Sequence, residues 1–276
     1  MISLKEFVES CPRLLVITGA GCSSSSGIPT YRGINGAWLR STPIQHQDFL
    51  RQSSSRQRYW ARSFVGWPAV ARAKPNAAHR HLVQLESLGI VKLLVTQNID
   101  RLHQFAGHKN VIDLHGRLDQ VICLSCGHIG SRAVMQERLI DLNPCLSERN
   151  NSLDGEGDLA PDGDAPIEEA IIATLKVPYC EKCDGILKPN VVFFGGTVKK
   201  EVVHHIYQQL DEVDGLLAVG TSLRVFSGYR ICKRAHELGK PIASINPGKT
   251  RADGMLSLKV SEDCGAALGQ WVDSIS

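Results

Sequence analysis

The chain has 276 residues, of which 43% are hydrophobic and 21% charged, and its formal net charge is +3. These values are typical of a globular protein with one large α/β domain and room for a smaller insert. Lysine and arginine do not cluster, so we expect no specific binding to nucleic acid. No apolar run approaches the roughly 18 residues of a membrane span, and the first residues lack the apolar segment of a signal peptide, so we expect no membrane partner.

The first apolar run, residues 14–18, ends at Gly19, which predicts a central parallel strand buried on both faces. Similar runs predict further strands at residues 91–96, 111–114, 216–220, 241–245 and 256–260. Helical patterns predict helices at residues 79–88, 200–210 and 227–238. Strands that alternate with helices in this way predict an α/β fold with a doubly wound, Rossmann-type parallel sheet.

The cysteines indicate metal chemistry rather than disulfide chemistry. There are 9 of them, and four form two C-x-x-C pairs, Cys123 with Cys126 and Cys180 with Cys183. An odd number in a chain of this length does not fit a secreted disulfide framework, so we expect a reducing, cytoplasmic location. Four thiolates with no open position favour one structural zinc ion. A redox pair or a zinc ribbon that binds nucleic acid remains an alternative, although two pairs and dispersed basic residues fit neither well.

Two regions interrupt the alternation of strands and helices. Residues 34–75 are rich in arginine and aromatic residues, and residues 117–189 contain both C-x-x-C pairs. Residues 148–164, rich in Asn, Asp, Gly and Glu, are predicted to form a surface loop. We therefore predict a Rossmann-type domain of residues 1–33, 76–116 and 190–276, and a smaller domain that combines a helical module, residues 34–75, with a zinc-binding module, residues 117–189.

A glycine-rich turn, Gly19-Ala20-Gly21, follows the first predicted strand. Nucleotide-binding turns have this position and composition, because glycine lets the backbone approach a pyrophosphate closely. The full G-x-G-x-x-G pattern is not met, since Ser24 stands at its last position, and no acidic ribose ligand follows about 20 residues later. The three residues by themselves favour no more than a tight turn.

Longer motifs along the chain resemble those of the sirtuin family. They are, in the family's order, GAGCSSSSGIPTYRG at 19–33, TQNIDRLH at 96–103, LHG at 114–116, KPNVVFFG at 188–195, GTSL at 220–223 and IN at 245–246. The resemblance extends from about Leu14 to Gly265. Segments 57–67, 160–164 and 227–230 look like the class II subgroup, which includes a mitochondrial member.

The resemblance implies a function as well as a fold. Sirtuins use NAD to remove acyl groups from lysine side chains of proteins or peptides, which gives nicotinamide, O-acyl-ADP-ribose and free lysine. Two other functions would use the same NAD site: mono-ADP-ribosyl transfer to a protein side chain, and NAD sensing without turnover. The combination of His115, Asn98 and Asp100 favours catalysis over sensing.

The resemblance also implies roles for these three residues. His115 would be the general base, which suits histidine because its ordinary pKa lies near neutral pH. Asn98 would orient a water molecule and the ribose, and Asp100 would contact the nicotinamide carboxamide. From the sequence alone, a histidine after a strand is more often structural, and residues 98–100 are also typical of helix capping.

Other candidates for the NAD and substrate sites follow from the resemblance. Tyr31 would shield the reactive face of the ribose, and Arg32 would hold the cofactor loop and the phosphates. Backbone groups near Ile28 and Ile99 would bind the carboxamide. The remaining cofactor candidates lie mostly after strand ends, where hydroxyl, amide and backbone groups can bind phosphate and ribose: Gly19, Ala20, Gly21, Ser23, Gln97, Gly220, Thr221, Ser222, Asn246 and Cys264. The acyl-lysine substrate would contact Val192, Phe193, Phe194 and Gly195.

Three positions depart from the family pattern. Thr30 stands where many members have Asp, Gly196 replaces a common Glu, and Cys22 replaces an apolar residue. Thr30 also occurs in the desuccinylase branch, where a Tyr-x-x-Arg pair reads an acidic acyl group. Tyr59 and Arg62 form such a pair on a predicted helix, and arginine can bind a carboxylate with two hydrogen bonds. Arg62 equally fits the solvated face of that helix.

Overall fold

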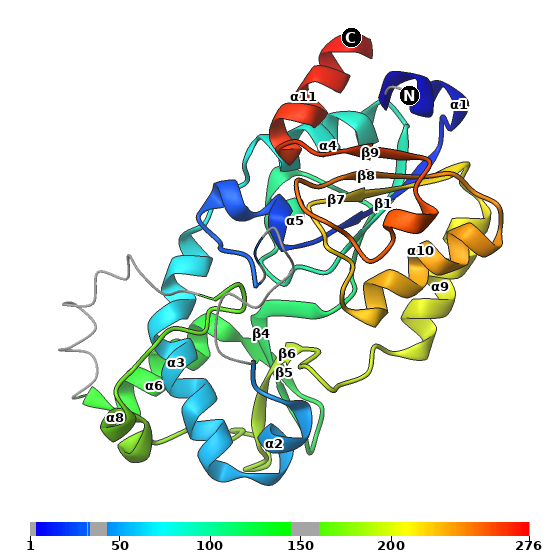
Figure 1. The fold of residues 1–276 in the computed structure, drawn as a ribbon. Coiled ribbons are helices and arrows are strands. Elements are labelled where there is room, and N and C mark those ends of the chain that lie inside the picture. Colours follow the sequence, from blue (N-terminus) through cyan, green and yellow to red (C-terminus); the bar gives the residue numbers. More distant parts are fainter. Residues whose placement is uncertain (1–3, 32, 34–42, 145–159, 276) are drawn as a thin grey trace.

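The computed structural model describes residues 4–31, 33, 43–144 and 160–275. Within these residues, six parallel strands form one sheet in the order β3-β2-β1-β7-β8-β9 (Figure 1). The strands are β1 (Leu14–Thr18), β2 (Val91–Thr96), β3 (Val111–Asp113), β7 (Gly215–Val219), β8 (Ile242–Ile245) and β9 (Leu258–Val260). All six lie where the sequence predicted them, with ends that shift by one or two residues.

The helices of the described residues are α1 (Leu4–Ser10), α2 (His46–Arg51), α3 (Ser53–Arg72), α4 (Ala77–Ser87), α5 (Leu102–Ala106), α6 (Arg132–Leu142), α8 (Glu169–Thr174), α9 (Lys200–Asp211), α10 (Phe226–Glu237) and α11 (Cys264–Ile275). Three short 3₁₀ turns are η1 (Ala20–Cys22), η2 (Ser24–Ser26) and η3 (Asp253–Met255). None of these helices is long and apolar enough to cross a membrane.

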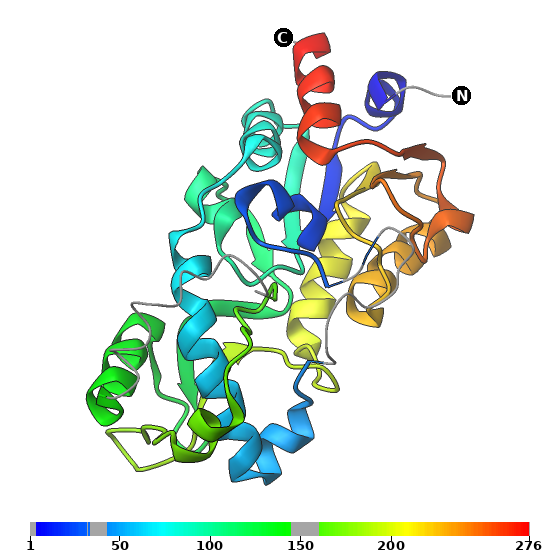
Figure 2. The ribbon, with the colours of Figure 1, turned by 60° about the vertical axis from the view of Figure 1, so that its left-hand side comes forward.

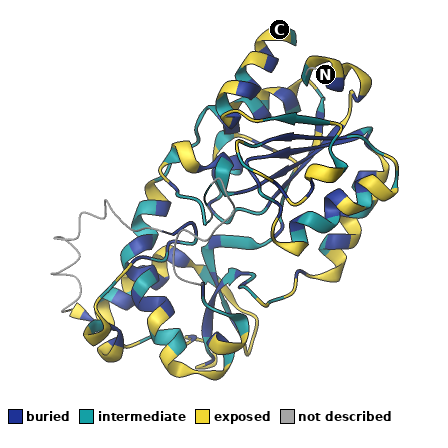
Figure 3. Ribbon diagram, viewed as in Figure 1, coloured by how far each residue is buried: buried dark blue, intermediate teal, exposed yellow. Residues whose placement is uncertain are grey.

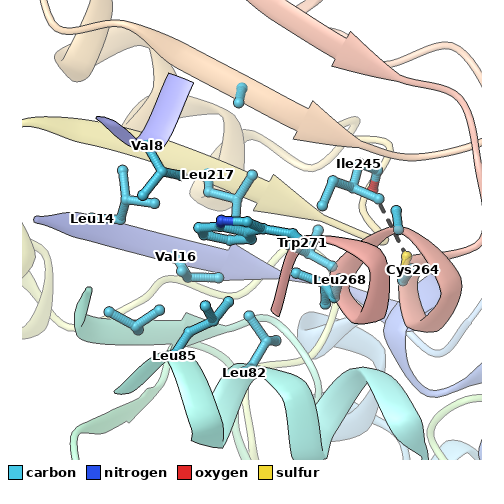
Figure 4. Close-up of a cluster of buried hydrophobic side chains, with 14 of the residues drawn as sticks. Val8, Leu14, Val16, Leu82, Leu85, Leu217, Ile245, Cys264, Leu268 and Trp271 are labelled. Carbon is cyan, nitrogen blue, oxygen red and sulfur yellow. Dashed lines mark hydrogen bonds between the residues drawn. The ribbon is translucent and has the colours of Figure 1, made fainter. Parts of the chain in front are cut away.

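Strand β1 shows why the sheet carries helices on both faces. Successive side chains of a strand point to opposite faces. Leu14 and Val16 enter a core cluster with residues of α1, α4 and α11, in which Trp271 lies centrally (Figure 4). Leu15 and Ile17 enter a second cluster with residues of α9 and α10. The continuous apolar run is therefore buried from both sides, as expected for a doubly wound sheet.

A smaller antiparallel sheet has the order β5-β4-β6, with β4 (Gly116–Cys123), β5 (Ile129–Ser131) and β6 (Leu187–Val191). The sequence did not predict these strands. Its core joins Trp60 and Phe64 of α3 to Leu139 of α6. Arg132 is fully buried there, with its guanidinium 4.8 Å from the centre of the Trp67 ring.

The two ends of the molecule carry different parts of the chain. Helices α1 and α11 lie together at one end, whereas α2, α6 and α8 lie at the other (Figures 1 and 2). The inner strands β1, β2, β7 and β8 are almost entirely buried, the edge strands β3 and β9 are half-buried, and the helices around the sheet expose one side (Figure 3).

Two element boundaries differ from the prediction for local reasons. Helix α4 begins before residue 79, because the Asn76 side chain accepts backbone N–H groups of Ala78 and His79 and caps the helix. Helix α11, which the sequence did not predict, begins at Cys264. The carboxylate of Asp263 accepts the next backbone N–H groups, at 2.9 and 3.0 Å, and so starts the helix there. Residues 148–159 of the predicted surface loop lie outside the described residues.

Candidate NAD and acyl-lysine site

A cavity of about 670 Å³ opens at the carboxyl ends of the central strands. Gly19, Gln97 and Gly220, which directly follow β1, β2 and β7, all line it. The strand order reverses between β1 and β7, since β2 and β3 lie on one side and β8 and β9 on the other. Parallel α/β sheets bind ligands at such a reversal, because the loops on either side diverge there.

Most of the predicted site residues line this cavity: Gly19, Ala20, Gly21, Ser23, Ile28, Tyr31, Tyr59, Gln97, Asn98, Ile99, Asp100, His115, Val192, Phe193, Phe194, Gly195, Gly220, Thr221, Ser222, Asn246 and Cys264. Two predicted residues do not join them. Arg32 lies outside the described residues. Arg62 lies outside the cavity lining, and its Nε pairs with the carboxylate of Asp164.

The glycine-rich turn packs directly against the turn after β7. A Cβ atom on Gly19 would lie 2.7 Å from Cβ of Thr221, and one on Gly21 would lie 2.8 Å from the carbonyl oxygen of Gly220. Gly220 has a φ of +60°, which favours glycine. The two turns can approach this closely only without side chains, and they leave a backbone-lined cradle of the kind that receives a pyrophosphate.

His115 lies between β3 and β4 with both ring nitrogens engaged. Nδ1 is 2.9 Å from the Gln97 carbonyl oxygen, which can only accept, so Nδ1 carries the proton. Nε2 therefore keeps its lone pair and accepts a 2.7 Å hydrogen bond from the Ser227 hydroxyl. Burial lowers the pKa of His115, which favours the neutral imidazole. The ring is thus a neutral base, and a hydroxyl group already donates a hydrogen bond to its unprotonated nitrogen.

Asn98, Ser23 and Asp100 form a hydrogen-bonded unit beneath the cavity. The Asn98 amide donates to the Gly19 carbonyl oxygen and to the Ser23 hydroxyl, both at 3.0 Å. The Ser23 hydroxyl donates to Asp100 Oδ2 at 2.7 Å, and Asp100 Oδ1 accepts the Leu102 N–H at 2.9 Å. Burial raises the pKa of Asp100. The capping role predicted for residues 98–100 therefore coexists with a position on the cavity wall.

Gln97 links the turns after β1 and β7. Its amide nitrogen donates to the Thr18 carbonyl oxygen at 3.1 Å and to the Thr221 hydroxyl at 2.8 Å. Gly228 makes room for it, since a Cβ atom there would lie 2.5 Å from Gln97 Oε1. The strand-end side chains of Gln97 and Thr221 are thereby held in place at the centre of the cavity.

Asn246 and Cys264 lie at the β8 side of the cavity. Asn246 follows β8, and its side-chain amide donates to the Gly248 carbonyl oxygen at 2.9 Å. The Cys264 thiol donates to the Ile245 carbonyl oxygen at 3.8 Å (Figure 4). Burial raises the pKa of the Cys264 thiol to about 12, so it stays protonated and unreactive.

The segment after β6 forms another wall of the cavity. The Val192 N–H donates to the His115 carbonyl oxygen at 2.8 Å, which places the segment beside the predicted base. The Phe194 carbonyl oxygen accepts the His46 N–H, also at 2.8 Å. Gly195 has a φ of +75°, so the chain turns sharply after the two phenylalanines. Val192 to Gly195 therefore lie along the wall where the resemblance places the substrate.

Two tyrosines and an acidic residue line a further part of the cavity. Tyr59 is buried and packs edge-on against Phe193, with ring centres 5.1 Å apart. The Tyr31 hydroxyl bonds to the carboxylate of Asp162, and burial raises the pKa of Asp162. An acyl chain in this region would therefore meet aromatic rings and a carboxylate. Arg62 is held away from it by its pair with Asp164.

The four predicted zinc ligands converge, with their sulfur atoms all within 4.8 Å of one another. Sγ of Cys123 lies 3.5 Å from that of Cys183, and Sγ of Cys126 lies 3.8 Å from that of Cys180. A tetrahedron with Zn–S bonds of about 2.3 Å has S···S edges of about 3.8 Å, whereas a disulfide needs about 2.05 Å. The cluster fits one structural zinc ion and excludes a disulfide between these pairs.

The sequence interpretation missed two residues of the site. Ser227, which donates to His115, and Asp162, which bonds to Tyr31, both line the cavity. Ser227 opens the segment 227–230 and Asp162 lies in the segment 160–164, both of which resemble class II sirtuins. Those resemblances could have indicated that the two segments belong to the site. Neither motif by itself predicts which residues its side chains contact.

The fold and this cavity define a class of protein, the dinucleotide-binding α/β enzymes. A cradle of turns at the strand-order reversal is typical of dinucleotide sites, and a neutral histidine with one unprotonated nitrogen provides a base. The model of the Sir2 family matches residues 19–227. The chain therefore belongs to the Sir2 family, the sirtuins.

Curated relatives match over nearly their whole length. The chain is 49% identical over 266 residues to "NAD-dependent protein deacetylase 2" of Bradyrhizobium diazoefficiens, which covers 96% of this chain and 95% of the relative. It is 47% identical over 268 residues to "NAD-dependent protein lipoamidase sirtuin-4, mitochondrial" of Bos taurus, which covers 96% of this chain and 83% of the relative. The resemblance to sirtuins is confirmed.

Solved structures share the fold. A crystal structure of a Sir2 homologue with NAD matches with a TM-score of 0.73 and 28% identity, covering 99% of this chain and 92% of that chain. A histidine variant of a Sir2 protein with a deacetylated peptide and 3′-O-acetyl-ADP-ribose matches with a TM-score of 0.75 and 26% identity, covering 98% and 96%. The predicted α/β fold is confirmed.

Proposed function

We propose that this chain is an NAD-dependent protein-lysine deacylase, which releases nicotinamide, O-acyl-ADP-ribose and free lysine. Family membership and the names of the relatives, which are NAD-dependent protein deacetylases, support this activity. The observation that carries it is His115, whose unprotonated Nε2 accepts a hydrogen bond from a hydroxyl group inside the cavity, beside the Val192–Gly195 segment. Nothing in the described residues favours ADP-ribosyl transfer over deacylation.

The glycine cradle and its neighbours are proposed to hold NAD. Bound NAD supplies the ADP-ribose that accepts the acyl group. Gly19, Gly21 and Gly220 let the two turns pack together at the cavity wall, and Thr221 and Ser222 offer hydroxyl and backbone donors after β7. Ser23, Asn98 and Asp100 are proposed to bind at the nicotinamide end, Gln97 and Asn246 at the two riboses, and Cys264 near the adenine.

His115 is proposed to act as the general base. Its Nδ1–H bond to the Gln97 carbonyl fixes the tautomer that leaves Nε2 free to accept a proton. The Ser227 hydroxyl, 2.7 Å from Nε2, marks where a ribose hydroxyl would present its proton. Asn98, held by Ser23 and Gly19, is proposed to orient a water molecule nearby.

Tyr59 and the Val192–Gly195 segment are proposed to hold the acyl-lysine. The T-shaped packing of Tyr59 on Phe193 forms an apolar wall suited to an aliphatic chain. Arg62 is proposed to support the acyl-lysine site indirectly, since its pair with Asp164 holds the segment that contains Asp162. Direct binding of an acyl carboxylate by Arg62 would require this pair to break.

Cell compartment and domain division are part of the same proposal. The odd number of cysteines, the two C-x-x-C pairs and the bacterial relatives support a cytoplasmic location. The cofactor is proposed to bind to the domain of residues 1–33, 76–116 and 190–276. The helical and zinc-binding modules, residues 34–75 and 117–189, are proposed to complete the acyl-lysine side.

The test is a panel of acetyl-, long-chain acyl-, lipoyl- and dicarboxylic-acyl-lysine peptides with and without NAD. We expect NAD-dependent release of nicotinamide together with O-acyl-ADP-ribose for at least one acyl chain, and neither product with His115→Ala. Transfer of labelled ADP-ribose to protein without peptide deacylation would instead identify an ADP-ribosyltransferase.

A further inference from the structure

A second group of side chains of metal-ligand type lies beside the glycine-rich turn, in the large-sheet half of the molecule. Ligand atoms of Cys22, His79 and His103 all lie within 4.8 Å of one another. Cys22 ends η1, His79 lies in the first turn of α4, and His103 lies in α5. All three are at most 1% exposed. Three segments far apart in the chain thus bring one thiol and two imidazoles together.

His103 has an available lone pair. The Thr18 hydroxyl donates to Thr96 and so accepts at the 2.9 Å contact from His103 Nε2–H. The neutral ring then has an unprotonated Nδ1, and this buried atom has no hydrogen-bond partner among the described residues. A buried acceptor without a partner is unusual in a folded protein. The lone pair of Nδ1 is therefore available to bind a metal ion.

His79 can bind an ion only if it gives up a hydrogen bond that it makes in the helix cap. Its Nδ1 accepts the Asn76 N–H at 3.2 Å, so Nε2 carries the proton, and Nε2 lies 3.5 Å from the Ser23 hydroxyl. Coordination through Nε2 would move that proton to Nδ1 and break the bond from Asn76. An ion here therefore exchanges one hydrogen bond of the helix cap for a metal–nitrogen bond, and the site is weaker than the four-cysteine cluster.

We propose that Cys22, His79 and His103 form a second, inhibitory site for Zn²⁺. One thiolate and two imidazoles are a donor set that suits Zn²⁺, and three protein ligands leave a fourth position. The thiol proton leaves to solvent when Cys22 binds the ion. Cys22 adjoins Ser23, whose hydroxyl holds Asp100 and Asn98 at the cavity. An ion bound there pulls on this turn and weakens NAD binding.

Ion binding is tested first, without turnover, so that its result is independent of the proposed function. Untagged chain with one zinc ion in the four-cysteine cluster is dialysed to equilibrium against buffered micromolar Zn²⁺, and bound zinc is measured by atomic emission. We expect two ions per chain for the wild type. We expect one for Cys22→Ala, and one for His103→Gln, which keeps a side-chain donor for Thr18 but loses the Nδ1 position.

Cys232→Ala is the matched control, because Cys232 is also buried but lies in the core cluster on the opposite face of the sheet. It should bind two ions. One ion per wild-type chain, or two in both site variants, overturns the proposal. Co²⁺ in place of the second zinc should also give a thiolate-to-metal absorption band in the wild type, and its loss in His103→Gln but not in Cys232→Ala supports the site if Cys22→Ala does not fold.

The inhibitory effect rests on the proposed function and is measured separately by direct NAD titration. Saturating the second site should weaken NAD binding about tenfold, and NAD should weaken zinc binding by the same factor, because the coupling between two sites is reciprocal. Cys232→Ala should respond like the wild type, whereas Cys22→Ala should bind NAD with the same affinity at all zinc concentrations. If the wild type binds NAD with the same affinity when it holds one zinc ion and when it holds two, the inhibitory role is overturned. The result on ion binding is not affected by that outcome.

Discussion

Replacement of His115 by alanine removes the proposed base and little else. The imidazole makes two hydrogen bonds, to the Gln97 carbonyl and the Ser227 hydroxyl, and both partner residues are half-buried. Each bond contributes about 0.5–1.5 kcal/mol, so the fold should lose at most about 3 kcal/mol of stability. NAD binding should be largely unchanged, because the glycine cradle and Gln97 remain.

The catalytic loss should be much larger than the structural one. A positioned general base contributes about 10²- to 10⁴-fold, which corresponds to about 3–5 kcal/mol of activation free energy. Product formation at saturating NAD and peptide should fall by this factor in His115→Ala, while the NAD dissociation constant changes by less than about threefold, within the uncertainty of a single lost contact. The assay is mass spectrometry of deacylated peptide together with direct NAD titration.

The control for this experiment is Ser227→Ala, which removes the hydroxyl on Nε2 but leaves the base in place. It should retain most of the activity, because a ribose hydroxyl is proposed to take the same place. Wild-type turnover in His115→Ala, or equal losses in the two variants, would refute the assignment of His115 as the base.

Four further predictions concern the base, the zinc cluster and the acyl-lysine side of the cavity. The acid limb of kcat/KM should lie below pH 6.5, since burial lowers the pKa of His115 below its ordinary value of 6.5: the base is neutral above its folded pKa and activity is lost as the pH falls through it. An acid limb above pH 7 would contradict this. Cys180→Ser should release the zinc ion and lower the melting temperature, because ion binding is coupled to folding; a stable variant that still holds one zinc per chain would disprove the structural site. Asp162→Asn removes a carboxylate from the cavity lining and should raise activity on succinyl-lysine relative to acetyl-lysine by about fivefold to tenfold, about 1 kcal/mol of repulsion. Arg62→Met should lower activity on both peptides together, whereas a selective loss on succinyl-lysine would mean that Arg62 binds the acyl carboxylate directly.

The sequence predicted those parts of the fold that repeat a local pattern. Leu14 to Thr18 is continuously apolar because both faces of β1 are covered, and the same reasoning located the other parallel strands. The two C-x-x-C pairs predicted the sulfur cluster because the spacing within each pair is local. The division into domains and the roles of individual site residues remain predictions.

Contacts between distant segments could not be predicted in the same way. Strand β4 pairs with β6 across the long zinc-binding insert, and neither strand carries a periodic pattern of its own. Ser227 contacts His115, from which it is separated by 112 positions in the sequence. Arg62 likewise pairs with Asp164, which lies far from it in the sequence. The departure at Cys22 was visible in the sequence, but its approach to two histidines depends on how η1, α4 and α5 pack.

The central claim is NAD-dependent transfer of an acyl group from lysine to ADP-ribose, and one measurement tests it most directly. Purified chain is incubated with NAD and an acyl-lysine peptide that carries an isotopic label in the acyl group, and the products are analysed by mass spectrometry. The account predicts that the label leaves the peptide and appears in O-acyl-ADP-ribose, in equal amount to released nicotinamide. Label recovered as free acid without nicotinamide release, or nicotinamide release with the label still on the peptide, would contradict it.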